Sequence, residues 1–318
     1  MDGPYAEAVG DALRVGGRVF REQLSQAADV YASAPQQLLL VAHCAACAVI
    51  FASLKRQWLL CYWIGFFGAF GGGHLSALLL SSISTKVVPL ALFASNQLFV
   101  TWTLTWLLVT YTPLYSIVSK PTVKTLAMAG LHMLRVGTII TRVDIAAAEF
   151  PGVIAAPVVI GTLGGCGGKI FTDFLLLVFT GRLEGLPELC CPGVAFHSAS
   201  AITLMHYLGV HVTAFLDSAQ SKALITTVVV AHILAEASLG IKTHWTAPMT
   251  AAFYALMPFE RNVQPKGAHA SSPVMARLNS RTPRVATPRR GSAANGSVAP
   301  MRRLSTKEEE PGRGKKTN

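Results

Sequence analysis

Two glycine clusters lie inside long apolar runs of this 318-residue chain, and they are the groups best suited to a chemical role. The clusters and the lysine that follows the second one are Gly71, Gly72, Gly73, Gly161, Gly164, Gly165, Gly167 and Lys169. Glycine lets a helix kink or unwind. Backbone carbonyls freed at such a point can coordinate a cation if they line a water-filled cavity. The clusters therefore predict an ion path along two kinked helices, with Lys169 lining it.

Close packing is the competing interpretation of the same glycines. Gly68 and Gly72 stand four residues apart, as do Gly161 and Gly165. Small residues at this spacing also let two helices approach closely in lipid. Because the clusters occupy matching places in two halves of the chain, we favour functional kinks, and packing can coexist with them.

Ionisable residues inside the apolar runs form the second group of candidates. Burying one in a membrane costs about 2.5–3.5 kcal/mol on insertion scales, so such residues usually have a task. Arg135 has no acid within its own helical turn and must face a partner helix, water or a lipid phosphate. We predict lipid binding or gating for Arg135 and His132, with a satisfied buried histidine as the alternative for His132. Lys169 and Asp173 lie one turn apart, so an ion pair is the alternative for Lys169.

The elements that would position these residues are membrane-spanning helices. Apolar residues make up 52% of the chain, charged residues make up only 14%, and the mean hydropathy is +0.45. Soluble domains carry about 25% charged residues. A spanning helix needs about 20 apolar residues. Seven segments come near this length: 37–54, 58–80, 87–110, 123–141, 153–179, 194–216 and 222–241. The predicted fold class is an all-α membrane protein with seven transmembrane helices.

Three regions follow from this pattern. Residues 1–33 form a leader, either an amphipathic helix on the membrane surface or a solvated segment, and residues 34–258 form the transmembrane domain. Residues 259–318 are predicted to be a disordered tail. From Arg261 onward the tail holds 13 Lys and Arg against three acids and no aromatic residue. Such a tail fits anionic lipid at the cytosolic surface better than nucleic acid.

The short loops set the predicted orientation. Lysines and arginines gather in the loops after the first, third and fifth segments, at Lys55, Arg56, Lys120, Lys124 and Arg182. Seven crossings place these loops on the same side as the C-terminal tail. The positive-inside rule then makes the tail cytosolic.

The two glycine clusters also indicate an internal repeat. Each lies in the middle segment of a group of three, namely segments one to three and four to six. A three-helix unit crosses the membrane an odd number of times, so its tandem copy faces the opposite way. The sequence therefore predicts two inverted three-helix repeats plus a seventh helix. In such folds, paired glycine-interrupted helices point to the substrate path.

The chain resembles the trimeric intracellular cation (TRIC) channels over roughly residues 57–241. Met133–Val136 matches the family's Val-Val-Arg-Val, and Thr112–Tyr115 resembles its Cys-Pro-Leu-Asp corner. Gly161, Gly165 and Gly167 match glycines in the family's stretch Thr-Gly-Trp-Val-Lys-Gly-Ser-Gly.

The resemblance implies a homotrimer with one potassium pore in each protomer, through the two kinked helices. It further implies an endoplasmic reticulum or other intracellular membrane, counter-ion current during calcium release, and a bound phosphoinositide lipid. The family holds that lipid with a Lys-Glu-Val motif and a nearby arginine. Here Leu131 and His132 replace the Lys-Glu pair, and only Arg135 is kept. The family's lysine in the second kinked helix falls on Gly164, with Lys169 one turn further on. The chain is identified as a divergent member.

Other classes of function stay open or are disfavoured. An inverted-repeat small-solute transporter and a non-conducting membrane scaffold are the two alternatives. An enzyme is not expected, because the sequence has no Gly-x-Ser-x-Gly, no His-Glu-x-x-His and no transmembrane aspartate pair. We therefore predict no catalytic residues, no metal site and no cofactor other than the lipid.

Overall fold

The computed structural model describes residues 4–52, 58–82, 84, 87–88, 91–180, 192–240, 244–248 and 250–251. The chain divides into a unit Met1–Ala268 and a unit His269–Asn318, and all that follows concerns the first. The predicted tail at 259–318 lies outside the described residues, so that prediction stays untested.

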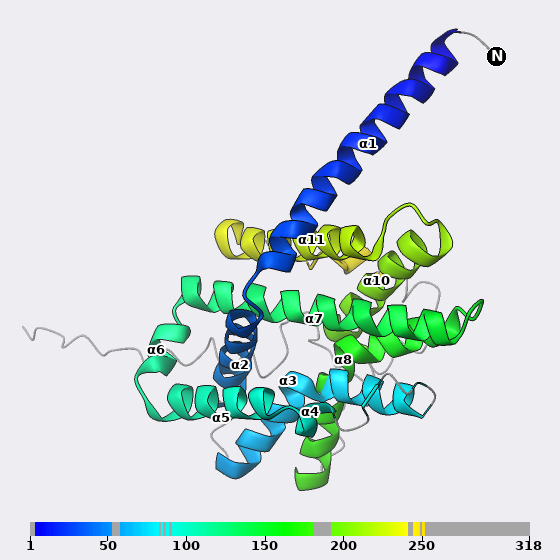
Figure 1. The fold of residues 1–318 in the computed structure, drawn as a ribbon. Coiled ribbons are helices and arrows are strands. Elements are labelled where there is room, and N and C mark those ends of the chain that lie inside the picture. The colour runs from blue at the N-terminus through cyan, green and yellow to red at the C-terminus, as the bar shows by residue number, and fades with distance from the viewer. Residues whose placement is uncertain are drawn as a thin grey trace, which may run out of the picture. The chain divides into compact units, whose positions relative to one another are not determined.

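Every regular element of the described residues is a helix (Figure 1). In chain order these are α1 (Pro4–Ser33), α2 (Gln36–Ala52), α3 (Trp58–Ser81), α4 (Ala91–Ala94), α5 (Asn96–Tyr111), α6 (Leu114–Val118), α7 (Pro121–Glu149), α8 (Ala155–Thr180), α10 (Val194–His206), the π-helix η2 (Tyr207–Val212) and α11 (Ser218–Leu239).

Four described helices are long and apolar enough to cross a membrane, namely α3, α7, α8 and α11. A fifth candidate is the α1–α2 pair, which bends by 77° at its break. Helices α2, α5 and α10 have 17, 16 and 13 residues. These lengths fall short of the roughly 20 residues of a full span, although α10 continues directly into η2. The all-α membrane class is confirmed, and the count of seven spans remains a prediction.

Two predicted boundaries were wrong for identifiable reasons. The third segment was expected from residue 87, but α5 begins at Asn96 because the Ser95 hydroxyl accepts the Leu98 N–H and caps the helix. The fourth was expected to end at 141, but α7 continues to Glu149. The Glu149 carboxylate accepts a hydrogen bond from the Ser84 hydroxyl at 2.7 Å, so the acid at this end of the helix has a polar partner in the folded chain.

The leader is helical, and its C-terminal half packs on α11. The amide of Gln220 donates to the Ser25 hydroxyl at 2.9 Å, and the hydroxyls of Tyr31 and Thr227 lie 3.1 Å apart. Leu24 is buried, whereas Leu13 is 72% exposed. Helix α1 is thus anchored through its C-terminal half, and it exposes the apolar side chains of Leu13, Val15 and Val19.

Two of the three hydrophobic clusters among the described residues lie in different groups of helices. One joins α2, α3 and α5 around Phe66, Trp102 and Trp106, and the thiols of Cys44 and Cys47 are buried within it. The other joins α7, α8, α10 and α11; its buried members include Ile139. A third cluster joins α3, α7 and α8 around Leu80, Ala146 and Ile160, so the helices that carry the glycine clusters also share a core.

Helix α11 begins with a complete capping box. The Asp217 carboxylate accepts the Gln220 N–H, and the Gln220 side chain accepts the Asp217 N–H. We expect Asp217→Ala to lower the free energy of unfolding by about 1 kcal/mol, because a helix N–H loses its acceptor. Asp217→Asn should stay near the wild type. Thermal unfolding of the detergent-purified full chain checks this, and equal losses in the two variants would contradict it.

Candidate functional site

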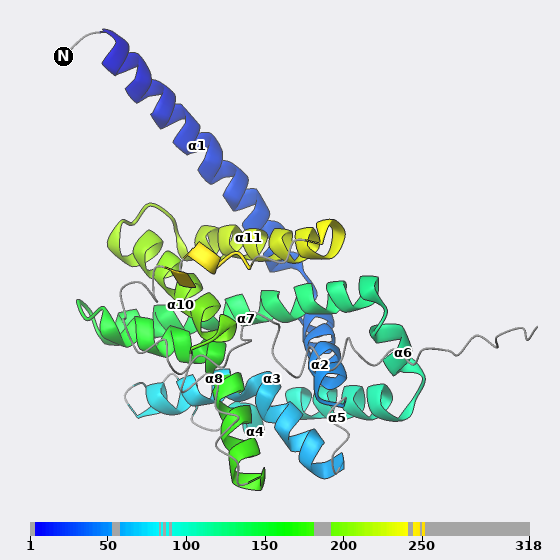
Figure 2. The ribbon, with the colours of Figure 1, turned by 180° about the vertical axis from the view of Figure 1, so that it is seen from behind.

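The two glycine clusters meet where α3 crosses α8, and Figures 1 and 2 show the two helices side by side. A Cβ atom added to Gly72 would lie 2.4 Å from the carbonyl oxygen of Gly164. One added to Gly168 would lie 2.4 Å from the carbonyl oxygen of Gly68. Since no real Cβ approaches an oxygen so closely, the helices touch backbone to backbone. The packing interpretation of the glycines is confirmed.

The remaining predicted glycines divide into three environments. Gly71 and Gly167 join the crossing, because a Cβ on Gly167 would lie 2.9 Å from the Cα of Gly72. Gly161 and Gly165 face α7 and α10 instead, where a Cβ would come within 2.4–2.6 Å of buried side chains. Gly73 and Gly164 have ordinary room, with the nearest atoms at 3.7 and 3.6 Å.

Both helices stay α-helical through their glycines, so the backbone bends without unwinding. Figure 1 shows α3 and α8 each changing direction part-way along. Hydroxyl groups bind the carbonyls at these points. Ser76 donates to the carbonyls of Gly72 and Gly73 at 3.0 and 3.1 Å, and Thr172 donates to that of Gly168 at 2.8 Å. Serine and threonine that bond back to the preceding turn bend helices, and glycine offers little resistance.

Arg135 faces partner helices, which is one of the three surroundings expected from the sequence. Its Nε donates to the carbonyl of Gly165 on α8 at 3.0 Å, and its Nη2 donates to the carbonyl of Ala195 at the start of α10 at 2.7 Å. The half-buried guanidinium thus ties α7 to two other helices through backbone oxygens. The sequence identified the residue but not these acceptors.

Arg142 reaches the other glycine cluster from the same helix. Its Nη2 lies 3.5 Å from the carbonyl oxygen of Gly73 on α3, a weak contact. Arg142 follows Arg135 by seven residues, which is two helical turns, so both project from one side of α7. Each kinked helix therefore has a glycine carbonyl facing a guanidinium of α7. The sequence analysis missed Arg142; its seven-residue spacing from Arg135 was the available signal.

His132 lies one turn before Arg135, within electrostatic range of Arg135 and of histidines on other elements, His43, His232 and His244. The His232 and His244 rings have centroids 5.4 Å apart. Beyond the end of α11, the pKa of His244 is lowered to about 4, mainly by burial and also by the neighbouring His232 and Arg135. This ring is neutral near pH 7, so it adds no positive charge beside Arg135.

Lys169 forms an ion pair with Asp173 one turn along α8, as the alternative interpretation predicted. The lysine side chain is 40% exposed and the aspartate only 2%. The aspartate of the pair is therefore buried, whereas the lysine side chain is partly exposed. Whether Lys169 lines an ion path stays a prediction.

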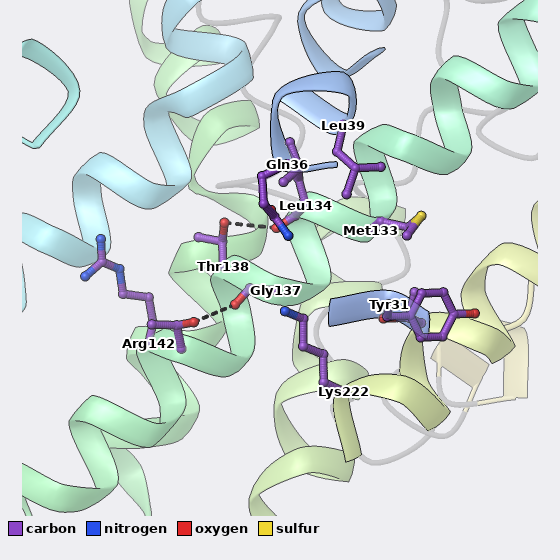
Figure 3. A pocket seen from close by; sticks show the side chains of 11 residues that line it. Tyr31, Gln36, Leu39, Met133, Leu134, Gly137, Thr138, Arg142 and Lys222 are labelled. Carbon is purple, nitrogen blue, oxygen red and sulfur yellow. Dashed lines mark hydrogen bonds between the residues drawn. The ribbon is translucent and has the colours of Figure 1, made fainter. Parts of the chain in front are cut away.

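A cavity of about 350 Å³ lies between α7, α11 and the α1–α2 junction (Figure 3). Two cationic side chains, Arg142 and Lys222, line it together with the hydroxyls of Tyr31, Thr138 and Thr226. Figure 3 shows the Lys222 amine directed toward Gly137 and the Arg142 guanidinium directed toward α3. Arg135, the predicted lipid ligand, is not among the lining residues. The cavity offers positive charge and hydroxyl donors, which suit an anionic headgroup.

At the glycine crossing, α7 thus places one arginine beside each glycine cluster. The family model of the TRIC channel matches residues 49–237, more than half of the chain. The chain belongs to the TRIC channel family. This confirms the resemblance seen over residues 57–241, and it places the chain in a family of channels rather than enzymes.

Solved structures agree on the fold of this TRIC family member. A trimeric intracellular cation channel from C. elegans in the absence of Ca²⁺ has a TM-score of 0.57 at 17% identity, covering 70% of this chain and 98% of that one. A structure described as a TRIC counter-ion channel in calcium release has a TM-score of 0.57 at 16% identity, covering 68% and 100%. The C. elegans channel with bound Ca²⁺ has a TM-score of 0.54 at 22% identity, covering 68% and 97%. No curated protein matches the chain.

Proposed function

We propose that this TRIC family member is a monovalent cation channel that conducts potassium across an intracellular membrane. Family membership over residues 49–237 is the observation that carries the proposal. We further propose seven spans built as two inverted three-helix repeats plus α11, assembled as a homotrimer. Helices at matching positions of the two halves pack on each other, α2 on α7 and α3 on α8. Helices related by a two-fold axis pack on each other in this way when they lie beside the axis.

The proposed path follows α3 and α8 near their bends. Carbonyl oxygens replace part of the hydration shell of a permeating cation. At each cluster, however, one glycine carbonyl faces a guanidinium, Arg135 at Gly165 and Arg142 at Gly73. A guanidinium held there repels a cation and competes for the same oxygen. We therefore propose that both arginines hold the path closed, and that conduction requires them to leave the carbonyls.

The physiological setting is proposed from the neighbours. One of them is described as a counter-ion channel in calcium release, and two are called intracellular cation channels. We propose the same counter-ion role in the endoplasmic reticulum or another intracellular membrane, with the tail at 259–318 in the cytosol. The phosphoinositide also remains a proposal, and the Lys222 amine offers its phosphates a cation in the cavity, whereas the Arg142 guanidinium would have to leave α3 to reach them.

Single-channel recording tests the proposal. The full-length protein is reconstituted in planar bilayers, with and without phosphoinositide, and current is recorded in symmetrical and then asymmetrical KCl. We expect cation-selective openings. Arg135→Ala should raise the open probability on the order of tenfold, because a charge-assisted hydrogen bond that holds the closed state is lost. Arg142→Ala should raise it less, since its contact at 3.5 Å is weaker.

Lys124→Ala serves as the matched control, because Lys124 is an exposed cation on the same helix. It should leave the open probability unchanged. Silent bilayers from folded, trimeric protein would overturn the channel proposal and favour the scaffold. Solute uptake without unitary current would favour the transporter. A fall in open probability on removing Arg135 would contradict its closing role while leaving the channel in place.

A further inference from the structure

A cluster of metal-binding side chains lies apart from the glycine crossing. The carboxylate of Asp144, near the end of α7, faces His206 at the end of α10 and His211 in η2. Its Oδ1 lies 2.7 Å from the Nε2 of His206 and 2.9 Å from the Nε2 of His211. One ligand atom from each of the three lies within 4.8 Å of the others. Both imidazole nitrogens therefore face the same carboxylate oxygen of Asp144.

The π-helix η2 is what brings the two histidines together. In an α-helix, residues five apart point about 140° away from each other. A π-turn bonds residue i to residue i+5 and so places the later one above the earlier. His206 precedes η2 and His211 lies within it, five residues on, with ring centroids 5.8 Å apart. π-Bulges frequently mark functional sites, and this one aligns two Nε2 atoms on one carboxylate.

Outer hydrogen bonds orient the ligands as they do in metal sites. The Nδ1 of His206 lies 2.9 Å from the Ser221 hydroxyl, which leaves Nε2 directed at Asp144. The Ser218 hydroxyl donates to the second carboxylate oxygen of Asp144 at 2.7 Å. Such partners fix ring orientation and tautomer around a metal. Both serines come from the first turn of α11, so the arrangement links four helical elements.

We propose that Asp144, His206 and His211 bind a divalent transition metal ion of the zinc class. Two imidazoles and one carboxylate, with a fourth position left to water, are a ligand set typical of zinc and unlike the all-oxygen sites of calcium and magnesium. Zinc bonds of about 2.0–2.2 Å in tetrahedral geometry hold ligand atoms about 3.3 Å apart. The Asp144 oxygen needs to move only about half an ångström away from each imidazole nitrogen, and the three ligand atoms already lie within 4.8 Å of one another, so side-chain rotation supplies the adjustment. His206 is fully buried, whereas the side chains of Asp144 and His211 are 32% and 27% exposed, so the ion has a way in.

A hydrogen-bonded network without metal is the competing explanation, because the carboxylate can accept from both rings. A direct measurement of metal binding distinguishes the hydrogen-bonded network from a metal site. The full-length protein, purified in detergent and stripped with a chelator, is titrated with Zn²⁺ by calorimetry and with Co²⁺ by visible absorption. We expect one ion per protomer and the intense absorption bands of tetrahedral cobalt. This readout requires no channel activity, so its result is independent of the proposed conduction.

Variants locate the ion. Asp144→Asn and His211→Ala should each weaken zinc binding by at least about 100-fold, since each removes a direct ligand. His232→Ala should bind like the wild type, although His232 belongs to the other histidine group near Arg135. Ser221→Ala keeps all three ligands and should weaken binding about 10–100-fold, provided that Ser221 orients His206.

Each variant is first checked for folding by size exclusion and thermal unfolding. Wild-type binding in the folded His211→Ala variant would overturn the site. Loss of binding in His232→Ala alone would move the ion to the other histidine group. Failure of the wild type to bind zinc in the micromolar range would leave only the hydrogen-bonded network.

Discussion

Gly72→Ala is expected to lower the free energy of unfolding by about 2–3 kcal/mol, because overpacking a close contact forces the backbone to shift. The added methyl would meet the carbonyl oxygen of Gly164 at 2.4 Å, and a backbone atom cannot rotate away as a side chain can. Thermal unfolding of the detergent-purified full chain measures the loss. Gly73→Ala is the matched control one residue away, where the nearest atom lies at 3.7 Å.

Gly73→Ala should be neutral or stabilising by up to about 1 kcal/mol, because glycine inside a helix is costly and the space is open. The same comparison holds on the other helix. Gly168→Ala meets the carbonyl of Gly68 at 2.4 Å, whereas Gly164→Ala meets its nearest atom at 3.6 Å. Equal stability changes for Gly72→Ala and Gly73→Ala, or for Gly168→Ala and Gly164→Ala, would show that these glycines are not needed for close contact between the helix backbones.

Lys169→Ala is expected to lower the free energy of unfolding by about 2–4 kcal/mol. Removing one partner of a fully buried ion pair costs about 3–5 kcal/mol, because the remaining charge loses its nearest opposite charge. The value here is lower because the lysine is 40% exposed while Asp173 is 2% exposed. Thermal unfolding in detergent again gives the measurement, with conduction recorded in parallel.

The control is a double-mutant cycle. Asp173→Asn is made alone and in the Lys169→Ala background, where it removes the buried charge and should restore most of the lost stability. If Asp173→Asn had the same effect in both backgrounds, the pair would be energetically unimportant. If the double variant regains stability but has altered conductance, Lys169 acts on the ion path in addition to pairing.

Much of the fold was predictable, because long apolar runs read directly as helices. The starts of α3 and α8 lay within about two residues of expectation, since each run has clear polar or glycine flanks. The Lys169–Asp173 pair also followed from spacing alone, because residues one turn apart on a helix are neighbours.

The rest depended on contacts between distant segments. Arg135 bonds to carbonyls 30 and 60 residues further along the chain, and carbonyls carry no sequence signature. Asp144 contacts His206 and His211 across separations of 62 and 67 residues. The π-turn that aligns the two histidines could not be predicted from any pattern in the sequence. The polar end of α7 was missed for the same reason, because its charges find partners only in the folded chain.

The backbone contact between α3 and α8 also has a mechanical consequence. Most helix pairs interlock through side chains, so turning one against the other forces those side chains past each other. At Gly68, Gly72, Gly164 and Gly168 the helices have no side chains to interlock. We therefore expect the crossing to act as a pivot about which the two helices rotate, with the stacked rings of Phe67 and Phe171 beside it. A small rotation there would displace the far ends of the two helices most. It would also move α7, because α7 is bonded to α8 through Arg135 and touches α3 through Arg142.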